Sequence, residues 1–289
     1  MLKLHAPGKV NLFIRILAQE KSGFHQLETL FSTLEFGDFI GIERTPSGIA
    51  LECDGPPMGP PEENLAFRAA KEFLEVGRVR EGVRIFLKKR IPPAAGLGGG
   101  SSDAGTTLRG LQDLFPGVLG ERDLLCVAAS LGSDIPFFLS PSPQALAWGR
   151  GDRILPLPPL PPAPVLLALP PVEVPTPRAY GLLVRDRRSY PPKASPRMLS
   201  PGAFSSWKQV ALLSENDFER TVFGEFPLLG RIRVALQETG PIFSLLSGSG
   251  AALFGLYEDE RVAALAKADL TDRFPDTRFV LTRTGSALT

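Results

Sequence analysis

Hydrophobic and polar positions in the first half of the chain follow the periods of both strands and helices. Val83, Ile85 and Leu87 recur at every second position, which is the period of a half-buried strand. Leu65, Ala69 and Phe73 recur at helical spacing instead. Together these patterns predict strands over 2–17, 27–43 (broken at Gly37-Asp38), 49–53 and 83–89, strands flanking Trp148, and helices over 64–76, 102–114 and 121–131.

The second half is introduced by a proline-rich run. Residues 156–164 contain six prolines in nine positions, and such a run lacks the N–H donors that a strand interior needs. We therefore expect an extended linker near this point, between a domain of residues 1–155 and one of residues 156–289. Beyond it the pattern predicts strand 165–169, a proline- and arginine-rich loop over 175–201, a helix near Trp207, helix 227–239, strands 243–246 and 251–257, helix 258–269 and strand 277–282. The final αββαβ order predicts helices on one face of an antiparallel sheet, so the expected fold class is α+β.

Composition excludes several classes of function. The 32 basic and 31 acidic residues give a net charge of +1, so no global positive field favours nucleic acid or an anionic membrane. No signal peptide or uncharged apolar stretch of membrane-spanning length is expected, which predicts a cytoplasmic protein. Cys53 and Cys126 are then expected to be buried free thiols. The 29 prolines suit a thermophile, although a biased genome composition would have the same effect.

The strongest candidate for chemistry is a glycine-rich segment. Four glycines occupy the five positions 96–100, between a predicted strand and a predicted helix. Such a backbone can approach a ligand closely, and the free N–H groups and dipole of a helix N-terminus attract an anion. Ser101 or Ser102 could cap the helix or bond a phosphate oxygen. A flexible loop with an ordinary N-cap is the alternative, and the framing Pro92-Pro93 pair speaks against it.

The segment differs from the common phosphate-binding motifs. A P-loop requires a Lys directly after its last glycine, and no Lys follows the glycines here. The GxGxxG spacing of a dinucleotide-binding fold is not met either. The signatures of protein kinases are absent from the sequence as well. We therefore expect a phosphate loop of another type.

Two polar segments are candidate partners of this loop. Lys9 and Asn11 stand two positions apart in an apolar strand, so both side chains face the same side and need polar partners. Asp134 follows Gly132, which is expected to end the preceding helix. A solvated lysine and a turn aspartate bonded to local backbone are the ordinary alternatives. The functional alternative is a carboxylate beside a reacting hydroxyl. A second glycine-serine loop at 247–250 is explained equally well by a hairpin turn.

Three motifs in this order resemble those of the GHMP kinase superfamily. They are A-P-G-K-x-N-L at 6–12, P-x-x-x-G-L-G-G-G-S-S-D-A at 92–104 and S-G-S-G-A-A-L-F at 247–254. The triple glycine, the Gly23-Phe24-His25 segment and the run 132–138 resemble the branch of the superfamily that phosphorylates a cytidine diphosphate-linked polyol in non-mevalonate isoprenoid synthesis.

The resemblance implies a two-domain architecture, with a ribosomal S5 domain 2-like nucleotide-binding domain followed by a ferredoxin-like αββαβ domain. It implies ATP as co-substrate, with Mg²⁺, and an enzyme that transfers phosphate to an alcohol. Lys9 and Asp134 match the pair at the acceptor hydroxyl. The ATP-binding residues implied are Pro93, Ala94, Ala95, Gly96, Leu97, Gly98, Gly99, Gly100, Ser101 and Ser102. The metal ligands stay unassigned.

For the polyol substrate the resemblance implies a cytosine pocket. His25 would bond the base, and Phe24, which stands where this branch usually has tyrosine, would stack on it while lacking the hydroxyl. Tyr180 would cover the other face of the base after the Pro-Thr pair at 175–176. Thr176 and Asn11 match positions near the substrate.

Other functions remain open at this point. A sister kinase could act on homoserine, mevalonate or a sugar, although such acceptors would not need the aromatic residues. A regulatory nucleotide-binding protein would not need both Lys9 and Asp134. An RNA-binding module would be expected to carry basic charge and aromatic RNA-binding motifs that this chain lacks. The expected partners are small molecules, with no nucleic acid or membrane, and a monomer and a homodimer are both allowed.

Overall fold

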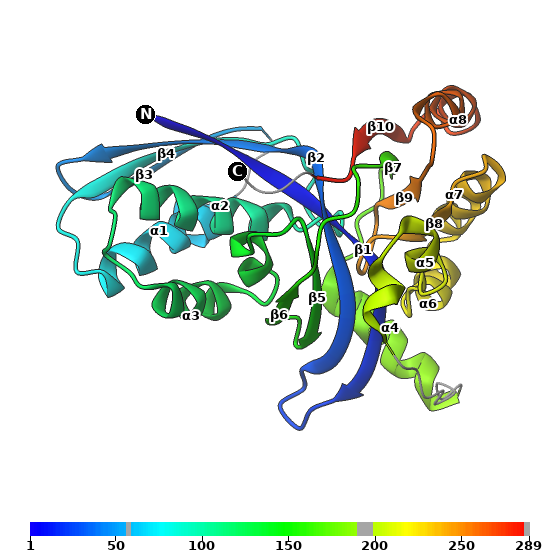
Figure 1. The fold of residues 1–289 in the computed structure, drawn as a ribbon, viewed down its shortest axis with the longest axis horizontal. Coiled ribbons are helices and arrows are strands. Elements are labelled where there is room, and N and C mark those ends of the chain that lie inside the picture. Colours follow the sequence, from blue (N-terminus) through cyan, green and yellow to red (C-terminus); the bar gives the residue numbers. More distant parts are fainter. Residues whose placement is uncertain (56–58, 190–198, 286–289) are drawn as a thin grey trace.

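The computed structural model describes residues 1–55, 59–189 and 199–285. These residues form a six-stranded and a four-stranded sheet with helices packed against both (Figure 1). The first sheet has the order β3-β4-β2-β5-β6, with β1 on the other edge of β2. Its strands are β1 (Leu2–Gln19), β2 (His25–Thr45), β3 (Ile49–Asp54), β4 (Gly82–Lys88), β5 (Gln144–Gly149) and β6 (Arg153–Pro156).

The long antiparallel hairpin of β1 and β2 organises the first sheet. β1 pairs with β2 from Leu2 to Gln19, and the opposite edge of β2 is shared by β4 and β5. The predicted break at Gly37-Asp38 is wrong, because β2 runs through it. A register shift in β1 between Pro7 and Lys9 takes up the irregularity opposite Gly37. A Cβ atom on Gly37 would lie 2.3 Å from the carbonyl oxygen of Ala6, so glycine permits close strand approach there.

Three helices cover one face of this sheet and share one core cluster with it. They are α1 (Leu65–Val76), α2 (Gly99–Leu114) and α3 (Glu121–Leu131), side by side in Figure 1. α1 begins after Asn64, whose side chain accepts a hydrogen bond from the N–H of Ala66. α2 begins three residues before the predicted start, because Gly98 adopts a left-handed conformation as its N-cap. The prediction that Ser101 or Ser102 caps this helix is therefore wrong.

The second sheet has the order β10-β7-β9-β8, and all its pairs are antiparallel. Leu166 and Ala168 of β7 join the cluster that contains the helices, whereas Val165 and Leu167 join a cluster with the β1–β2 hairpin. One face of this sheet is thus covered by helices and the other by the first sheet. Its elements are β7 (Pro164–Leu169), β8 (Phe243–Leu246), β9 (Leu253–Leu256) and β10 (Arg278–Arg283), with α7 (Pro227–Glu238) and α8 (Glu260–Arg273).

Several predictions for the second half need correction. The loop predicted over 175–201 contains α4 (Thr176–Ser189), and its residues 190–198 lie outside the described part of the chain. The helix was missed because only Ala179 and Leu183 of its narrow apolar stripe are fully buried. Additional short helices follow, namely η3 (Pro201–Phe204), α5 (Trp207–Ala211), which was expected, and α6 (Glu219–Glu225), which was not.

The cysteine prediction is half right. Cys53 and Cys126 are free, but both are exposed and not buried. Cys53 lies on the edge strand β3, and Cys126 lies on the outer side of α3. Among the described residues, no helix is both long and apolar enough to cross a membrane.

Candidate active site

A cavity of about 1540 Å³ gathers residues from both halves of the chain. Lys9, Phe24, Asp134 and Tyr180, which are far apart in sequence, all line it. The other predicted residues on its wall are Asn11, His25, Thr176 and the loop residues Pro93, Ala94, Ala95, Gly96, Leu97, Gly98, Gly99, Gly100 and Ser101. Ser102 is the exception, since its side chain is fully buried beneath the loop.

The glycine-rich loop is held by its neighbours on both sides. The N–H of Lys9 donates to the carbonyl oxygen of Leu97 over 2.9 Å. On the other side, the hydroxyl of Ser247 donates to the carbonyl oxygen of Gly96 over 3.0 Å, and the N–H of Ala252 donates to Ala95 over 3.0 Å. These contacts fix the shape of the loop, as an anion cradle requires.

The loop delivers three backbone N–H groups to the cavity. The first α-helical hydrogen bond of α2 runs from the N–H of Ser102 to the carbonyl oxygen of Gly98 over 2.8 Å. The N–H groups of residues 99–101 precede it and have no intrahelical partner. They lie at the positive end of the helix dipole on the cavity wall. This arrangement suits a phosphate chain.

Lys9 and Asp134 meet on the cavity wall. Their Nζ and Oδ2 atoms are 3.5 Å apart, and Lys9 is only 4% exposed. Lys9 Nζ also donates to Asn11 Oδ1 over 2.7 Å, so the two strand residues share a face as predicted. Burial lowers the pKa of Lys9, and the charge of Asp134 opposes that shift.

A hydrogen-bond chain fixes the position of this pair. Asn11 Nδ2 donates to Thr29 Oγ1 over 2.8 Å, and Thr29 Oγ1 donates to the carbonyl oxygen of Phe13 over 2.6 Å. The Asp134 side chain is 32% exposed and faces the cavity, at the start of η2 (Ile135–Leu139). A buried cation is thus held beside an accessible carboxylate, which suits proton abstraction from a bound hydroxyl.

Aromatic side chains lie at another part of the cavity wall. His25 and Tyr180 stack with ring centroids 4.6 Å apart, and the Tyr180 and Phe218 rings pack edge to face with centroids 4.9 Å apart. Within the described structure, the buried His25 Nε2 has no hydrogen-bond partner. Burial lowers the pKa of His25, and the charge of Arg187 adds to this shift. Phe24 is 57% exposed, and Cζ of the Arg150 guanidinium lies 4.2 Å from the centroid of the Phe24 ring.

The second glycine-serine loop belongs to the cavity wall, which the hairpin explanation does not predict. Thr176 Oγ1 lies 3.2 Å from Ser249 Oγ, which joins the start of α4 to this loop. Gly248 has φ +56°, and a Cβ atom there would lie 3.2 Å from Asn11 Oδ1 and 3.4 Å from Lys9 Nζ. Glycine at this position therefore leaves room for the lysine.

A buried ionic cluster at the base of the loop was not predicted from the sequence. Lys89 Nζ contacts Asp103 Oδ2 at 2.6 Å and also contacts the Asp38 carboxylate. Asp38 in turn accepts from the N–H of Ile91 over 2.9 Å, just before the loop. Burial raises the pKa of Asp103 to about 7 against the opposing charge of Lys89. These residues come from three separate elements, so no local pattern links them.

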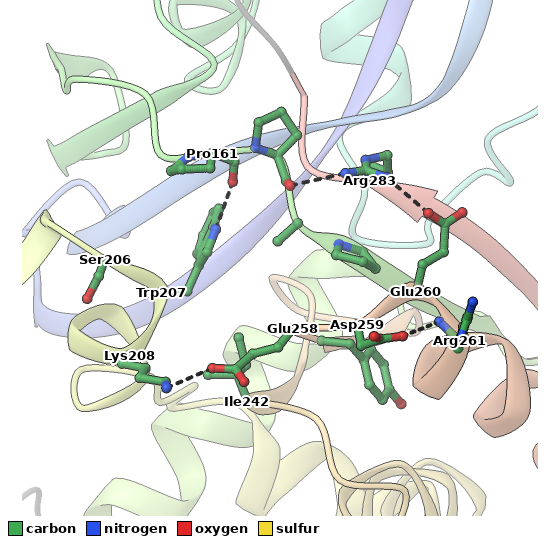
Figure 2. A pocket seen from close by; sticks show the side chains of 14 residues that line it. Pro161, Ser206, Trp207, Lys208, Ile242, Glu258, Asp259, Glu260, Arg261 and Arg283 are labelled. Carbon is green, nitrogen blue, oxygen red and sulfur yellow. Dashed lines mark hydrogen bonds and ion pairs between the residues drawn. The ribbon is translucent and has the colours of Figure 1, made fainter.

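A second cavity, of about 600 Å³, contains none of the predicted residues (Figure 2). Four charged side chains on its wall form two ion pairs. Lys208 meets Glu258 at 2.9 Å and Arg283 meets Glu260 at 3.1 Å. Trp207 donates from Nε1 to the carbonyl oxygen of Pro161 over 2.9 Å. Arg283 Nη2 also donates to the carbonyl oxygen of Pro162 over 3.4 Å. The contacts of Trp207 and Arg283 fasten the proline-rich linker to α5 and β10, so we assign this cavity a structural role.

Comparisons with known proteins agree with the motifs. The GHMP kinases N terminal domain matches residues 64–141, and the GHMP kinases C terminal domain matches residues 197–276. A 4-diphosphocytidyl-2-C-methyl-D-erythritol kinase from Geobacter sp. (strain M21) is 37% identical over 272 residues, 93% of this chain and 94% of the relative. One of the same name from Thermus thermophilus is 40% identical over 255 residues, 88% of this chain and 86% of the relative.

Solved structures give the same result. A crystal structure of 4-(cytidine 5'-diphospho)-2C-methyl-D-erythritol kinase matches with a TM-score of 0.82 and 37% identity, covering 99% of this chain and 100% of that one. A homoserine kinase from Cytophaga hutchinsonii matches with a TM-score of 0.73 at 16% identity, covering 100% of this chain and 95% of that one, and so shares the fold alone. The predicted α+β class and two-domain GHMP kinase architecture are confirmed, and the chain belongs to the 4-diphosphocytidyl-2-C-methyl-D-erythritol kinase family.

Proposed function

We propose that the protein transfers the γ-phosphoryl group of ATP to the 2-hydroxyl of 4-diphosphocytidyl-2-C-methyl-D-erythritol, giving the 2-phosphate and ADP. The observation that carries the proposal is that one cavity holds the glycine-rich loop, the Lys9–Asp134 pair and the aromatic residues. The names of the relatives supply the substrate. The reaction places the enzyme in the non-mevalonate isoprenoid pathway.

The Lys9–Asp134 pair would act on the acceptor hydroxyl. Phosphoryl transfer passes through a loose transition state, so orientation and charge neutralisation carry most of the catalysis. Asp134 orients the hydroxyl and takes its proton late in the step. Lys9 stabilises the negative charge that develops nearby. The contacts of Lys9 with Asn11 and Asp134 support these roles because they direct the ammonium group to the cavity.

The loop from Pro93 to Ser101 would hold the ATP phosphates through its backbone N–H groups. We propose that Ser102 supports the loop from beneath, because its side chain is buried and its N–H makes the first hydrogen bond of α2. Among the described residues, no group of three or more His, Cys, Asp or Glu side chains could hold a metal. Mg²⁺ commonly keeps several waters and binds through substrate phosphates, so the phosphates of ATP would supply its principal ligands.

The aromatic part of the wall would bind the cytosine. In the part of the chain that the structure describes, His25 Nε2 is buried without a hydrogen-bond partner, and a base edge would supply one. Phe24 and Tyr180 offer ring faces for stacking. Thr176 and Asn11 are proposed substrate contacts on the same wall. A site that bonds a base discriminates strongly against substrates without one.

Three coarser features complete the proposal. The domain boundary is proposed at residues 155–156, near the end of β6 at Pro156 and before β7 begins at Pro164. The enzyme is proposed to work in the cytoplasm, as a monomer or homodimer.

The test is ADP release by the purified protein with ATP, Mg²⁺ and the cytidyl substrate, with homoserine, mevalonate and galactose run in parallel. Turnover with the cytidyl substrate alone would support the proposal. Turnover with one of the other acceptors instead would support a kinase but contradict the proposed cytosine pocket. ATP binding without any turnover would indicate a regulatory protein.

A further inference from the structure

Arg150 joins two turns at the cavity wall. It lies in the turn between β5 and β6, and its guanidinium contacts the turn of residues 20–24 between β1 and β2. Arg150 Nη2 lies 2.5 Å from Glu20 Oε2, and its Nε lies 3.3 Å from Oε1 of the same carboxylate. The guanidinium also covers the Phe24 ring at 4.2 Å. One side chain thus holds the β1–β2 turn by a bidentate ion pair and by a cation–π contact.

The two turns carry different parts of the proposed site. The residues following Glu20 lead to Phe24 and His25, which we assign to the base. The β5–β6 turn packs beside the proposed catalytic carboxylate, because a Cβ atom on Gly151 would lie 3.7 Å from Asp134 Oδ1. The link through Arg150 therefore sets the distance between the base-binding side chains and the reacting centre.

We propose that Arg150 is a positioning residue that fastens the β1–β2 turn to the β5–β6 turn and so holds Phe24 and His25 at a fixed place relative to Asp134. This inference rests on the proposed function. Lys9 and Lys89, the other cations lining the cavity in the described structure, are buried and paired, whereas Arg150 is 43% exposed on its side chain. In the described structure the Arg150 guanidinium contacts Glu20, Ser22 and Phe24, so its removal breaks no contact with the phosphate loop.

Kinetics of Arg150→Ala, Glu20→Gln and the double variant provide the first test. Arg150→Ala should raise KM for the cytidyl substrate about tenfold, because it removes an exposed ion pair and a cation–π contact. Glu20→Gln should raise this KM about threefold, because it removes the ion pair alone. The KM for ATP should stay within about twofold, whereas kcat should fall a few-fold, about twofold to fivefold, because the hydroxyl is placed less accurately beside Asp134. The double variant should resemble Arg150→Ala because both changes break one link. Arg153→Ala, an exposed arginine next to the same turn that does not line the cavity, is the matched control and should behave as wild type.

Two results would overturn the proposal. Additive effects would show that Arg150 and Glu20 act separately. The second result is a raised KM in Arg150→Ala with an unchanged or lowered KM in Glu20→Gln. Because Glu20→Gln frees the guanidinium from its carboxylate partner, this pattern would show that Arg150 binds the substrate diphosphate directly.

Hydrogen exchange separates this proposal from the proposed function. The N–H of Glu20 donates to Phe24 over 2.7 Å and the N–H of Gly23 to Glu20 over 2.9 Å. Both should exchange faster in Arg150→Ala if the turn is held by Arg150. Unchanged exchange would refute the positioning role whatever the kinetics. Absence of turnover in the wild type would refute the proposed function, and the exchange result would still decide the role of Arg150.

Discussion

His25 and Tyr180 stack on each other, with ring centroids 4.6 Å apart and ring planes inclined by 27°. The stack joins the start of β2 to α4, which belong to different halves of the chain. A cytosine bound by these side chains would extend the stack or separate it, so the Tyr180 ring should contribute to substrate affinity. We predict that Tyr180→Ala raises KM for the cytidyl substrate about tenfold or more, since base–aromatic stacking contributes ~1–3 kcal/mol per base.

The control is Tyr180→Phe, which keeps the ring. Burial raises the pKa of Tyr180 to about 12, so its hydroxyl stays neutral at physiological pH and its removal changes no charge. Steady-state kinetics should show an unchanged KM for ATP in both variants. Equal losses in Tyr180→Phe and Tyr180→Ala would argue that the hydroxyl and not the ring face binds the substrate.

The paired charges of the site should affect kcat and not binding. We expect Asp134→Asn to lower kcat about 10²–10⁴-fold, the usual contribution of a general base. Lys9→Met should lower kcat about 10²–10³-fold, because it removes stabilisation of developing negative charge. Single-turnover phosphoryl transfer would measure both. A variant with full kcat and a raised KM would show that the residue only binds substrate.

Gly98 of the glycine-rich loop leaves the space that the Lys9 side chain occupies. Gly98 has φ +67°, and a Cβ atom there would lie 3.0 Å from Lys9 Cγ. Gly98→Ala should therefore lower both the melting temperature and kcat, because it strains the backbone and displaces the ammonium group. Gly117 has φ +77°, and a Cβ atom there would meet nothing within 4 Å, so Gly117→Ala is the control for strain alone. Gly117→Ala should lower the melting temperature and leave kcat unchanged. A loss of kcat in both Gly117→Ala and Gly98→Ala would show that backbone strain, and not displacement of Lys9, lowers the activity.

Asp103 should give the stability a characteristic pH dependence. Its pKa is raised from 3.8 to about 7 by burial, so between these values the folded protein binds a proton that the unfolded chain has released. Stability due to this group is therefore present at low pH and lost as pH rises through that window. The melting temperature of wild type relative to Asp103→Asn should fall from pH 5 to pH 8.

Two comparisons make this result interpretable. Asp272→Asn, at an exposed position of α8, should show no such trend relative to wild type. A constant difference between wild type and Asp103→Asn across the range would mean that Asp103 keeps one protonation state. That outcome would favour a permanently ionised pair with Lys89.

The sequence revealed those parts of the site whose signal is local. The phosphate loop shows as consecutive glycines before a helix, and Lys9 and Asn11 show as polar residues two positions apart in an apolar strand. The fold class followed from hydrophobic periodicity for the same reason. Where a glycine serves a distant contact the local interpretation failed, as at Gly37, which permits close approach of β1 instead of ending β2.

Features that depend on tertiary structure could not be read from the chain. Lys89 and Asp38 are 51 positions apart, and only the folded sheet brings them together. Arg150 and Glu20 are 130 positions apart, in two turns that carry no motif. The start of α2 was placed too late because serine is the commoner cap, whereas Gly98 begins this helix through its backbone conformation.

The second sheet uses one face to bury the β1–β2 hairpin, and this has a consequence for how the protein denatures. Val10 and Leu12 of β1 share a cluster with Leu167 of β7 and Phe254 of β9. Neither half could lose its structure without exposing apolar surface of the other. The two halves should therefore melt together in one calorimetric transition, and residues 1–155 expressed alone should not form a stable domain. The proposed boundary therefore separates two domains in topology, but the two domains should unfold as one cooperative unit.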